Sequence, residues 1–118
     1  IMLADGSVSA YMSESPQRVI SAGAANTVAE MMTAVISSGT GSSAAPTHLS
    51  AGGKTATAEA GYKSNGQSVN QCWFSGFYPH ENPEYVITVL AENGISGSKT
   101  AAPVFKSVCD GIYELYYS

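Results

Sequence analysis

Residues 51–61, AGGKTATAEAG, decide the fold because they open a run of strand-like segments that ends at residue 92. Residues 69–78 and 85–92 continue the run with the β-branched and aromatic side chains typical of strands. Asn65-Gly66 separates the first two segments, and residues 79–83 separate the last two; both connections have turn composition. Because short connections favour neighbouring antiparallel strands, the sequence predicts a three-stranded antiparallel meander.

A helix is expected before these strands. Ser21 can cap its amino terminus, and Gly39 is predicted to end it in a left-handed conformation. The apolar positions recur at the helical spacing i, i+3, i+4, i+7 and i+8, and they are Val28, Met31, Met32, Val35 and Ile36. The methionine pair is expected to fill the core, since thioethers adapt to irregular gaps.

A second helix is expected after the strands, from about Thr100, with Pro103 in its first turn, where the missing amide costs nothing. One apolar stripe along it is predicted from Phe105, Val108, Ile112 and Leu115. Residues 1–3 and 8–12 flank Asp5-Gly6 and predict an amino-terminal hairpin. The fold class is therefore α+β.

The third strand is apolar on both of its alternating faces, so we expect the sheet to be covered on both sides. The carboxy-terminal helix can cover one face. The first helix, the hairpin and material outside this chain are the candidates for the other face.

Composition limits the function. With 118 residues, 44% hydrophobic and 12% charged, the chain has the material of one folded domain or part of one. A net charge of −4 offers no field for a phosphate backbone, so nucleic acid is not an expected partner. No apolar run is long enough for a membrane span, and the chain as given is expected to be soluble. The strand-like opening at Ile1 indicates a portion of something longer.

The cysteines and histidines do not predict a metal site. Cys72 and Cys109 lie 37 positions apart, which matches no zinc motif, and buried free thiols are favoured. A disulfide between them stays open if the protein faces an oxidising exterior. His48 and His80 lie in separate loops without further ligands at metal spacing.

Lys54 is conspicuous in a chain with so few charges. It follows Gly52-Gly53, but a phosphate loop would require Gly-x-x-x-x-Gly-Lys-Ser/Thr leading into a helix, and strand-like residues follow here. A lysine and a hydroxyl displayed on a strand fit the border of an acyl-transfer site better.

Four segments in order support that interpretation: Ser37-Ser38-Gly39-Thr40-Gly41, residues 53–59 (GKTATAE), residues 73–79 (WFSGFYP) and Ala102-Pro103-Val104-Phe105. Together they resemble the carboxy-terminal part of the transpeptidase domain of class B penicillin-binding proteins, in the serine D,D-peptidase and β-lactamase superfamily. The resemblance implies a partial β-lactamase/transpeptidase-like fold.

The resemblance also implies a mechanism. An active-site serine attacks the D-Ala-D-Ala bond of a peptidoglycan stem peptide, an amine of a neighbouring stem captures the acyl group, and β-lactams mimic the substrate. No cofactor and no metal are implied. A membrane anchor would hold the parent protein at the extracytoplasmic face of the bacterial cell membrane.

Site residues follow from the same resemblance. Lys54 would attract the substrate carboxylate and favour deprotonated catalytic groups, and the Thr55 hydroxyl would bind the carboxylate. Thr57 would give its backbone N–H to the oxyanion hole, and its side chain could touch the ligand.

Two departures qualify the resemblance. Ala56 replaces the glycine of Lys-Thr-Gly, and strand alternation puts its methyl group on the face of Lys54. The nucleophile motif Ser-x-x-Lys and the Ser-x-Asn motif have no room upstream. The matches Ser68-Val69-Asn70 and Ser96-Gly97-Ser98-Lys99 occur in reversed order and are interpreted as chance. Residues 1–118 are therefore expected to form a carboxy-terminal segment that lacks the nucleophile, needs the missing part of the domain as its partner and is inactive alone.

Two alternatives remain. Ala56 is compatible with a non-catalytic β-lactam sensor or a degenerate penicillin-binding module. A small secreted adhesion or interaction domain fits the Ser, Thr, Gly and Ala richness, but leaves the four ordered segments unexplained.

Overall fold

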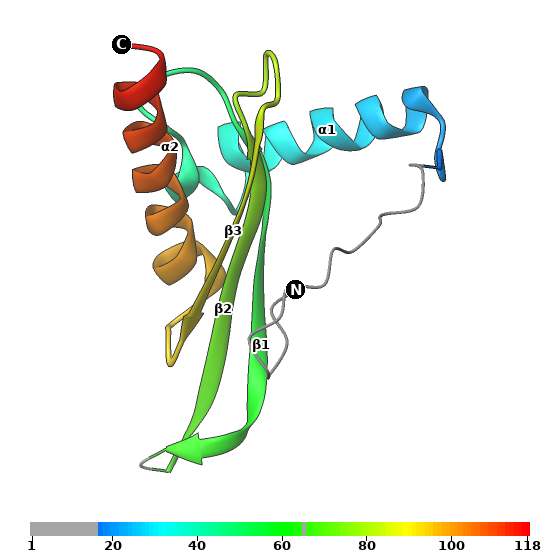
Figure 1. Ribbon diagram of the computed structural model, residues 1–118. Coiled ribbons are helices and arrows are strands. Elements are labelled where there is room, and N and C mark those ends of the chain that lie inside the picture. The colour runs from blue at the N-terminus through cyan, green and yellow to red at the C-terminus, as the bar shows by residue number, and fades with distance from the viewer. Residues whose placement is uncertain (1–16, 65) are drawn as a thin grey trace, which may run out of the picture.

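The computed structural model describes residues 17–64 and 66–118, which form a sheet and two main helices (Figure 1). The elements in chain order are α1 (Ala22–Ser37), the 3₁₀ turn η1 (Ser42–Ala44), β1 (Gly52–Ser64), β2 (Gln67–Tyr78), β3 (Tyr85–Glu92), the π-helical turn η2 (Gly97–Ala101) and α2 (Ala102–Tyr116). This order confirms the predicted α+β class. The predicted amino-terminal hairpin lies outside the described residues. None of the described helices is long and apolar enough to cross a membrane.

The sheet is the predicted meander, with strand order β1-β2-β3 and antiparallel pairing throughout. Ser64 pairs with Gln67, so only two residues connect β1 to β2, and Gly66 has a φ of 79°, which favours glycine. The register shifts between Glu59 and Lys63. β1 therefore continues past residue 61, where the sequence pattern ended it.

One face of the sheet packs against α2 and forms the core. Phe74 and Phe105 have ring centroids 4.6 Å apart, and both side chains are fully buried. Tyr78, Cys72 and Cys109 are equally buried, and both cysteines are free thiols, as predicted. Burial raises the pKa of Cys109 to about 12, with a smaller contribution from the neighbouring Asp110 carboxylate, so this thiol is uncharged at neutral pH.

The opposite face of the sheet, which we call the outer face, carries Trp73 and Phe77 of β2 and Val86 and Leu90 of β3. Val86 is 83% exposed and Leu90 is 45% exposed. Exposure alternates along β3, so neither α1 nor any other described element of this chain covers Val86 and Leu90, and the predicted cover of this face stays a prediction. The two apolar faces predicted from the sequence are real, but α2 covers only one of them.

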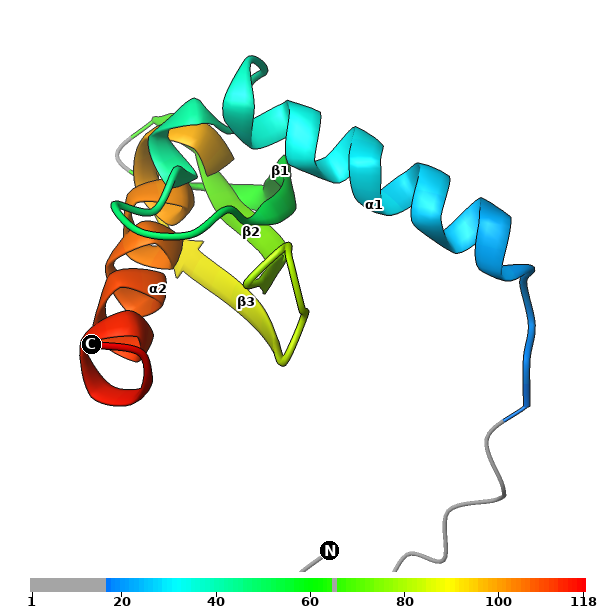
Figure 2. The same ribbon diagram turned by 90° about the horizontal axis from the view of Figure 1, so that it is seen from above.

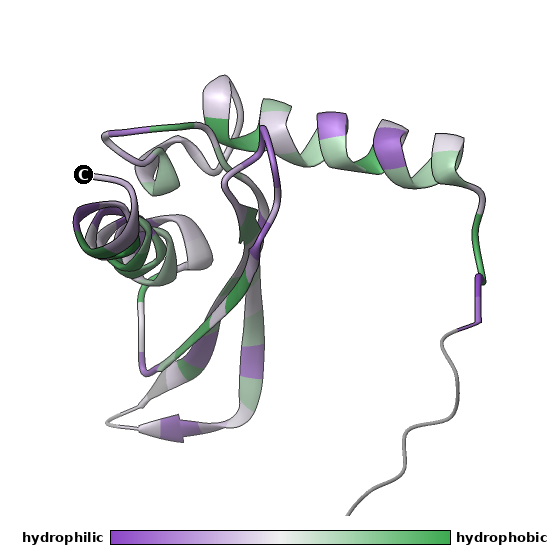
Figure 3. Ribbon diagram, turned by 45° about the horizontal axis from the view of Figure 1, so that its top comes forward, coloured by the Kyte–Doolittle hydropathy of each residue, from purple (hydrophilic) through white to green (hydrophobic). Residues whose placement is uncertain are grey.

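α1 begins as predicted, with the Ser21 hydroxyl accepting from the Ala24 N–H at 3.1 Å. Its predicted core stripe is only partly right: Ile36 is buried and Met32 and Val35 are half-buried, but Val28 and Met31 are more than half exposed. The carboxy-terminal part of α1 lies against the sheet, Thr33 and Glu30 contact His80 in the loop after β2, and the amino-terminal part projects away on the side opposite α2 (Figures 1 and 2). Hydrophobic segments alternate with hydrophilic ones along this projecting part (Figure 3).

The left-handed conformation predicted for Gly39 at the end of α1 is wrong. Gly39 does not have the positive φ of a left-handed stop. Glycine is required there by close packing, because a Cβ atom would lie 2.9 Å from the Cα and the carbonyl oxygen of Val35. The tight turn that follows is held by the Gly41 N–H, which donates to the Val35 carbonyl at 2.9 Å.

α2 begins with a proline in its first turn, as predicted. Its buried stripe differs from the predicted one: Phe105 and Cys109 are buried and Ile112 packs against them, whereas Val108 is 40% exposed and Leu115 is 76% exposed. The buried stripe therefore passes through Cys109, which lies four residues after Phe105 and so on the same face of the helix.

The loop before β1 is tied to α2. The Thr47 backbone N–H donates to Asp110 Oδ1 at 2.7 Å, and the Thr47 hydroxyl donates to Oδ2 at 3.0 Å. Lys106 Nζ lies 2.8 Å from the same carboxylate. Tyr78 adds a hydrogen bond from its hydroxyl to the His48 carbonyl at 3.0 Å. These contacts fix the position at which β1 starts.

Candidate functional site

The polar groups predicted to act together lie on β1, along the edge that pairs with no other strand among residues 17–64 and 66–118. Lys54 Nζ donates to the Thr55 carbonyl at 2.7 Å and lies 3.5 Å from Thr55 Oγ1. The Thr40 hydroxyl, from the turn after α1, lies 3.3 Å from Thr55 Oγ1. One ammonium and two hydroxyls therefore gather at this edge, which we call the Lys54 edge.

Glycines and the end of α1 explain this arrangement. Gly41 allows the chain to turn tightly, since a Cβ atom there would lie 2.9 Å from Val35 Cγ1, and the turn brings Thr40 beside β1. Gly53 directly precedes Lys54, and a Cβ atom there would lie 2.6 Å from Cζ of the Phe74 ring. The buried phenylalanine thus packs directly beneath the strand that carries Lys54.

Thr57 lies two residues beyond Thr55 and on the same side of the strand. Its hydroxyl oxygen accepts from the Gly97 backbone N–H at 3.0 Å. Lys54 pairs with Ser75 and Ala56 pairs with Trp73, which confirms that Lys54 and Ala56 share a face, the outer one. Ala56 is exposed, and its methyl group lies on the same face of β1 as the Lys54 side chain.

This arrangement suits an anionic ligand. Thr57 Oγ1 uses a lone pair for Gly97, which leaves the hydroxyl hydrogen available for another acceptor. Within residues 17–64 and 66–118, no carboxylate lies within 4.0 Å of Lys54 Nζ, so no salt bridge in this part of the chain neutralises the ammonium. Hydrogen bonds from a cation and from hydroxyls to one anion are short and strong.

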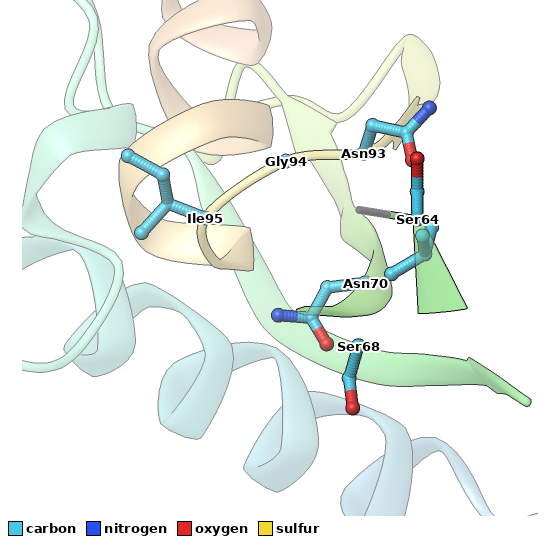
Figure 4. A pocket seen from close by; sticks show the side chains of 7 residues that line it. Ser64, Ser68, Asn70, Asn93, Gly94 and Ile95 are labelled. Atoms are coloured by element: carbon cyan, nitrogen blue, oxygen red, sulfur yellow. The ribbon is translucent and has the colours of Figure 1, made fainter. Parts of the chain in front are cut away.

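The two chance matches lie elsewhere. Ser68 and Asn70 line a hollow of about 460 Å³ between the distal part of the β1–β2 hairpin and the loop after β3 (Figure 4). Asn70 pairs with Glu59, five residues and roughly 17 Å along β1 from Lys54. Neither residue is positioned to complete the Lys54 edge.

Ser96 and Lys99 are not an acyl-transfer pair either. The Ser96 hydroxyl accepts from the Lys99 backbone N–H at 3.2 Å and caps η2, while the Lys99 side chain is exposed. The Ser-x-x-Lys match is therefore the start of a helical turn.

The sequence did not indicate site roles for Thr40 and Gly97, which contact Thr55 and Thr57 from 15 and 40 residues away. Both residues did lie in segments that the sequence singled out, the Gly-Thr-Gly run and the Ser-x-x-Lys match. The two histidines contact neighbouring helices: His80 Nδ1 lies 3.0 Å from the Thr33 hydroxyl of α1, and the His48 ring stacks on Tyr113 of α2.

Comparison with known proteins matches most of the chain. The penicillin binding protein transpeptidase domain family matches residues 6–110. A peptidoglycan D,D-transpeptidase FtsI homolog from Chlorokybus atmophyticus is 34% identical over 111 residues, which cover 89% of this chain and 16% of that protein.

Solved structures agree as well. The transpeptidase domain of the FtsI4 D,D-transpeptidase from Legionella pneumophila superposes with a TM-score of 0.71 and 31% identity, covering 79% of this chain and 37% of that one. Penicillin binding protein 3 from Mycobacterium tuberculosis gives 0.74 and 28%, covering 95% and 28%. The chain thus spans well under half the length of each of these relatives, over a segment that includes the Lys54 edge. It belongs to the penicillin binding protein transpeptidase domain family.

Proposed function

We propose that the chain is part of a D,D-transpeptidase that cross-links peptidoglycan stem peptides through an acyl-serine intermediate and reacts with β-lactams. The Lys54 edge carries the proposal, because it offers an ammonium and the Thr55 hydroxyl, and the exposed Thr57 hydroxyl follows two residues further along β1. A carboxylate lying along this edge would meet one positive charge and two hydroxyl donors. Stem peptides that end in D-Ala and penicillins both carry such a carboxylate.

Each residue has a distinct role in this proposal. Lys54 attracts the carboxylate and favours the deprotonated form of catalytic groups that approach it. Thr55 donates its hydroxyl hydrogen to the carboxylate. Thr57 contributes its backbone N–H to the oxyanion hole, where the loss of one donor typically costs roughly 10²–10³ in rate. The acyl transfer needs no metal and no organic cofactor, because the serine ester stores the acyl group.

The nucleophilic serine would come from the rest of the transpeptidase domain, of which residues 1–118 form the carboxy-terminal segment. The exposed outer face supports this, since Val86 and Leu90 stand beside the strand that bears Trp73. The segment alone is then inactive, and the missing part of the domain is its first partner. Peptidoglycan stem peptides and β-lactams are the proposed ligands, at the extracytoplasmic face of the bacterial cell membrane.

Fluorescent penicillin labelling of the intact protein tests the proposal. The wild type should form a covalent adduct that survives denaturation and that unlabelled penicillin prevents. Lys54→Gln removes the ammonium and should slow labelling by at least about tenfold, the effect expected for one charged hydrogen bond. Lys63→Gln, an exposed lysine at the far end of the same strand, is the matched control. An unlabelled wild type, or a K54Q protein labelled as fast as wild type, would contradict the proposal.

Ala56 favours a second candidate, a non-catalytic β-lactam sensor or degenerate penicillin-binding module, because its methyl group stands at the site border. The two candidates differ in product formation. A transpeptidase forms cross-linked dimers from stem peptides, a sensor forms only the penicillin adduct, and a degenerate module forms neither.

A further inference from the structure

The turn that precedes α2 packs directly on the strand of the Lys54 edge. A Cβ atom at Gly97 would lie 2.5 Å from the Ala56 carbonyl oxygen, 2.6 Å from that of Trp73 and 2.9 Å from the Ala56 nitrogen. Gly97 is buried and therefore lies against the backbone of both β1 and β2. No other residue type fits there without displacement of the turn or the strands.

The same turn is fixed by its own hydrogen bonds. The Ser96 carbonyl accepts from the Thr100 N–H at 2.8 Å, and the Ile95 N–H donates to the Thr100 hydroxyl at 3.0 Å. Ser43 donates its hydroxyl to the Ser98 carbonyl at 2.5 Å. The turn continues into the buried Ala101 and Ala102, so the Gly97 N–H has a direction set by the core.

We infer that Gly97 is a positioning residue that orients the Thr57 hydroxyl toward the ligand. The Gly97 N–H donates to Thr57 Oγ1 at 3.0 Å and occupies one lone pair. Because the Gly97 N–H occupies one lone pair of the Thr57 oxygen, the hydroxyl hydrogen must point away from Gly97. Thr57 is exposed, so this hydrogen can reach a ligand that lies along the edge of β1. This inference rests on the proposed function, because it assigns the freed hydrogen to the ligand carboxylate.

Variants at the two positions test the inference through acylation of the intact protein by fluorescent penicillin, with binding and acylation measured separately. Thr57→Val removes the hydroxyl but keeps the shape, and it should weaken penicillin binding about tenfold. Thr57→Ser should lose less than T57V. Gly97→Ala displaces the turn and should lose at least as much binding as T57V, but G97A should cost less in the T57V background than in the wild type, since the hydrogen bond between the two residues is then already absent.

Gly111→Ala is the matched control, because a Cβ atom at this α2 glycine meets no atom within 4 Å. Its binding and acylation should equal those of the wild type. Hydrogen exchange reports the contact itself: the Gly97 amide should be protected in the wild type and in T57S, and should exchange faster in T57V.

The outcomes separate the two proposals. If the wild type is labelled but G97A weakens binding equally with and without the Thr57 hydroxyl, or not at all, the positioning role is wrong and the proposed function stands. Unchanged Gly97 exchange in T57V also overturns the positioning role. If the wild type is not labelled, the proposed function fails, and the role in ligand binding fails with it.

Discussion

The methyl group of Ala56 stands on the same face as the Lys54 side chain, where it narrows the approach to the β1 backbone. Ala56→Gly should therefore raise the acylation rate with penicillin, by roughly threefold or more if the methyl displaces the ligand. Glycine should also lower the free energy of unfolding by about 0.5–1 kcal/mol, because it loses more backbone entropy on folding.

Two measurements on the intact protein check this prediction: the rate of fluorescent penicillin labelling and unfolding in urea. Ala58→Gly, two residues further along the same face, should reproduce the loss of stability without the gain in acylation. Equal acylation rates for A56G and wild type would show that the methyl group is not an obstacle.

For individual residues, the sequence identifies site residues that belong to one segment. It does not identify residues from different segments that come together only in the folded protein. Lys54, Thr55 and Thr57 follow one another on one strand, so a motif can identify them together. Thr40 and Gly97 reach the same edge through the turn after α1 and the turn before α2. Those contacts depend on where two helices dock, which local composition does not encode.

The loop before β1 and helix α2 are joined by Asp110. Desolvation acts to raise the pKa of this carboxyl group, but hydrogen bonds from Lys106 and Thr47 outweigh it, and the pKa is lowered. The folded state therefore gains stability above the unfolded pKa, about 3.9, and loses it as the pH falls through the folded pKa. Asp110→Asn should lower the free energy of unfolding by about 1–2 kcal/mol at pH 7, a modest figure because the carboxylate is partly exposed.

Urea unfolding of wild type and D110N at several pH values measures this effect. The difference between the two proteins should shrink below about pH 4, where the unfolded carboxylate is protonated. Glu59→Gln, an exposed carboxylate of β1, should show little effect at either end of the range. A D110N deficit that stays constant down to pH 2 would mean that charge is not its cause.

Element positions follow from the sequence better than element burial does. The turn residues fix β1, β2 and β3, and Ser21 and a proline mark the starts of α1 and α2. The apolar stripes of both helices were only partly right. An apolar stripe predicts that another surface packs against it, but no described residue buries Val28 and Met31 of α1.

At the scale of the whole molecule, the outer face of the sheet is one of several places where the described residues expose apolar side chains, the others being α1, α2 and the loops. The outer face of the sheet carries Val86 and Leu90, and α1 leaves the sheet on the same side, opposite α2 (Figure 2). Burying a valine or leucine side chain contributes roughly 1.5–3 kcal/mol. An uncovered surface of this kind is typical of a face that binds another protein surface.

The isolated chain should therefore bind a hydrophobic dye through the outer face. The double variant V86E/L90E should lower dye fluorescence by at least about half, because two charges then occupy the apolar surface. Its far-ultraviolet circular dichroism should stay unchanged, since neither side chain belongs to the buried core. Ile95→Glu is the matched control: this isoleucine is 71% exposed, but it lies in the turn before η2 and not on the outer face. Equal dye binding by wild type and V86E/L90E, or an equal loss in I95E, would show that the outer face is not the surface left open for the rest of the domain.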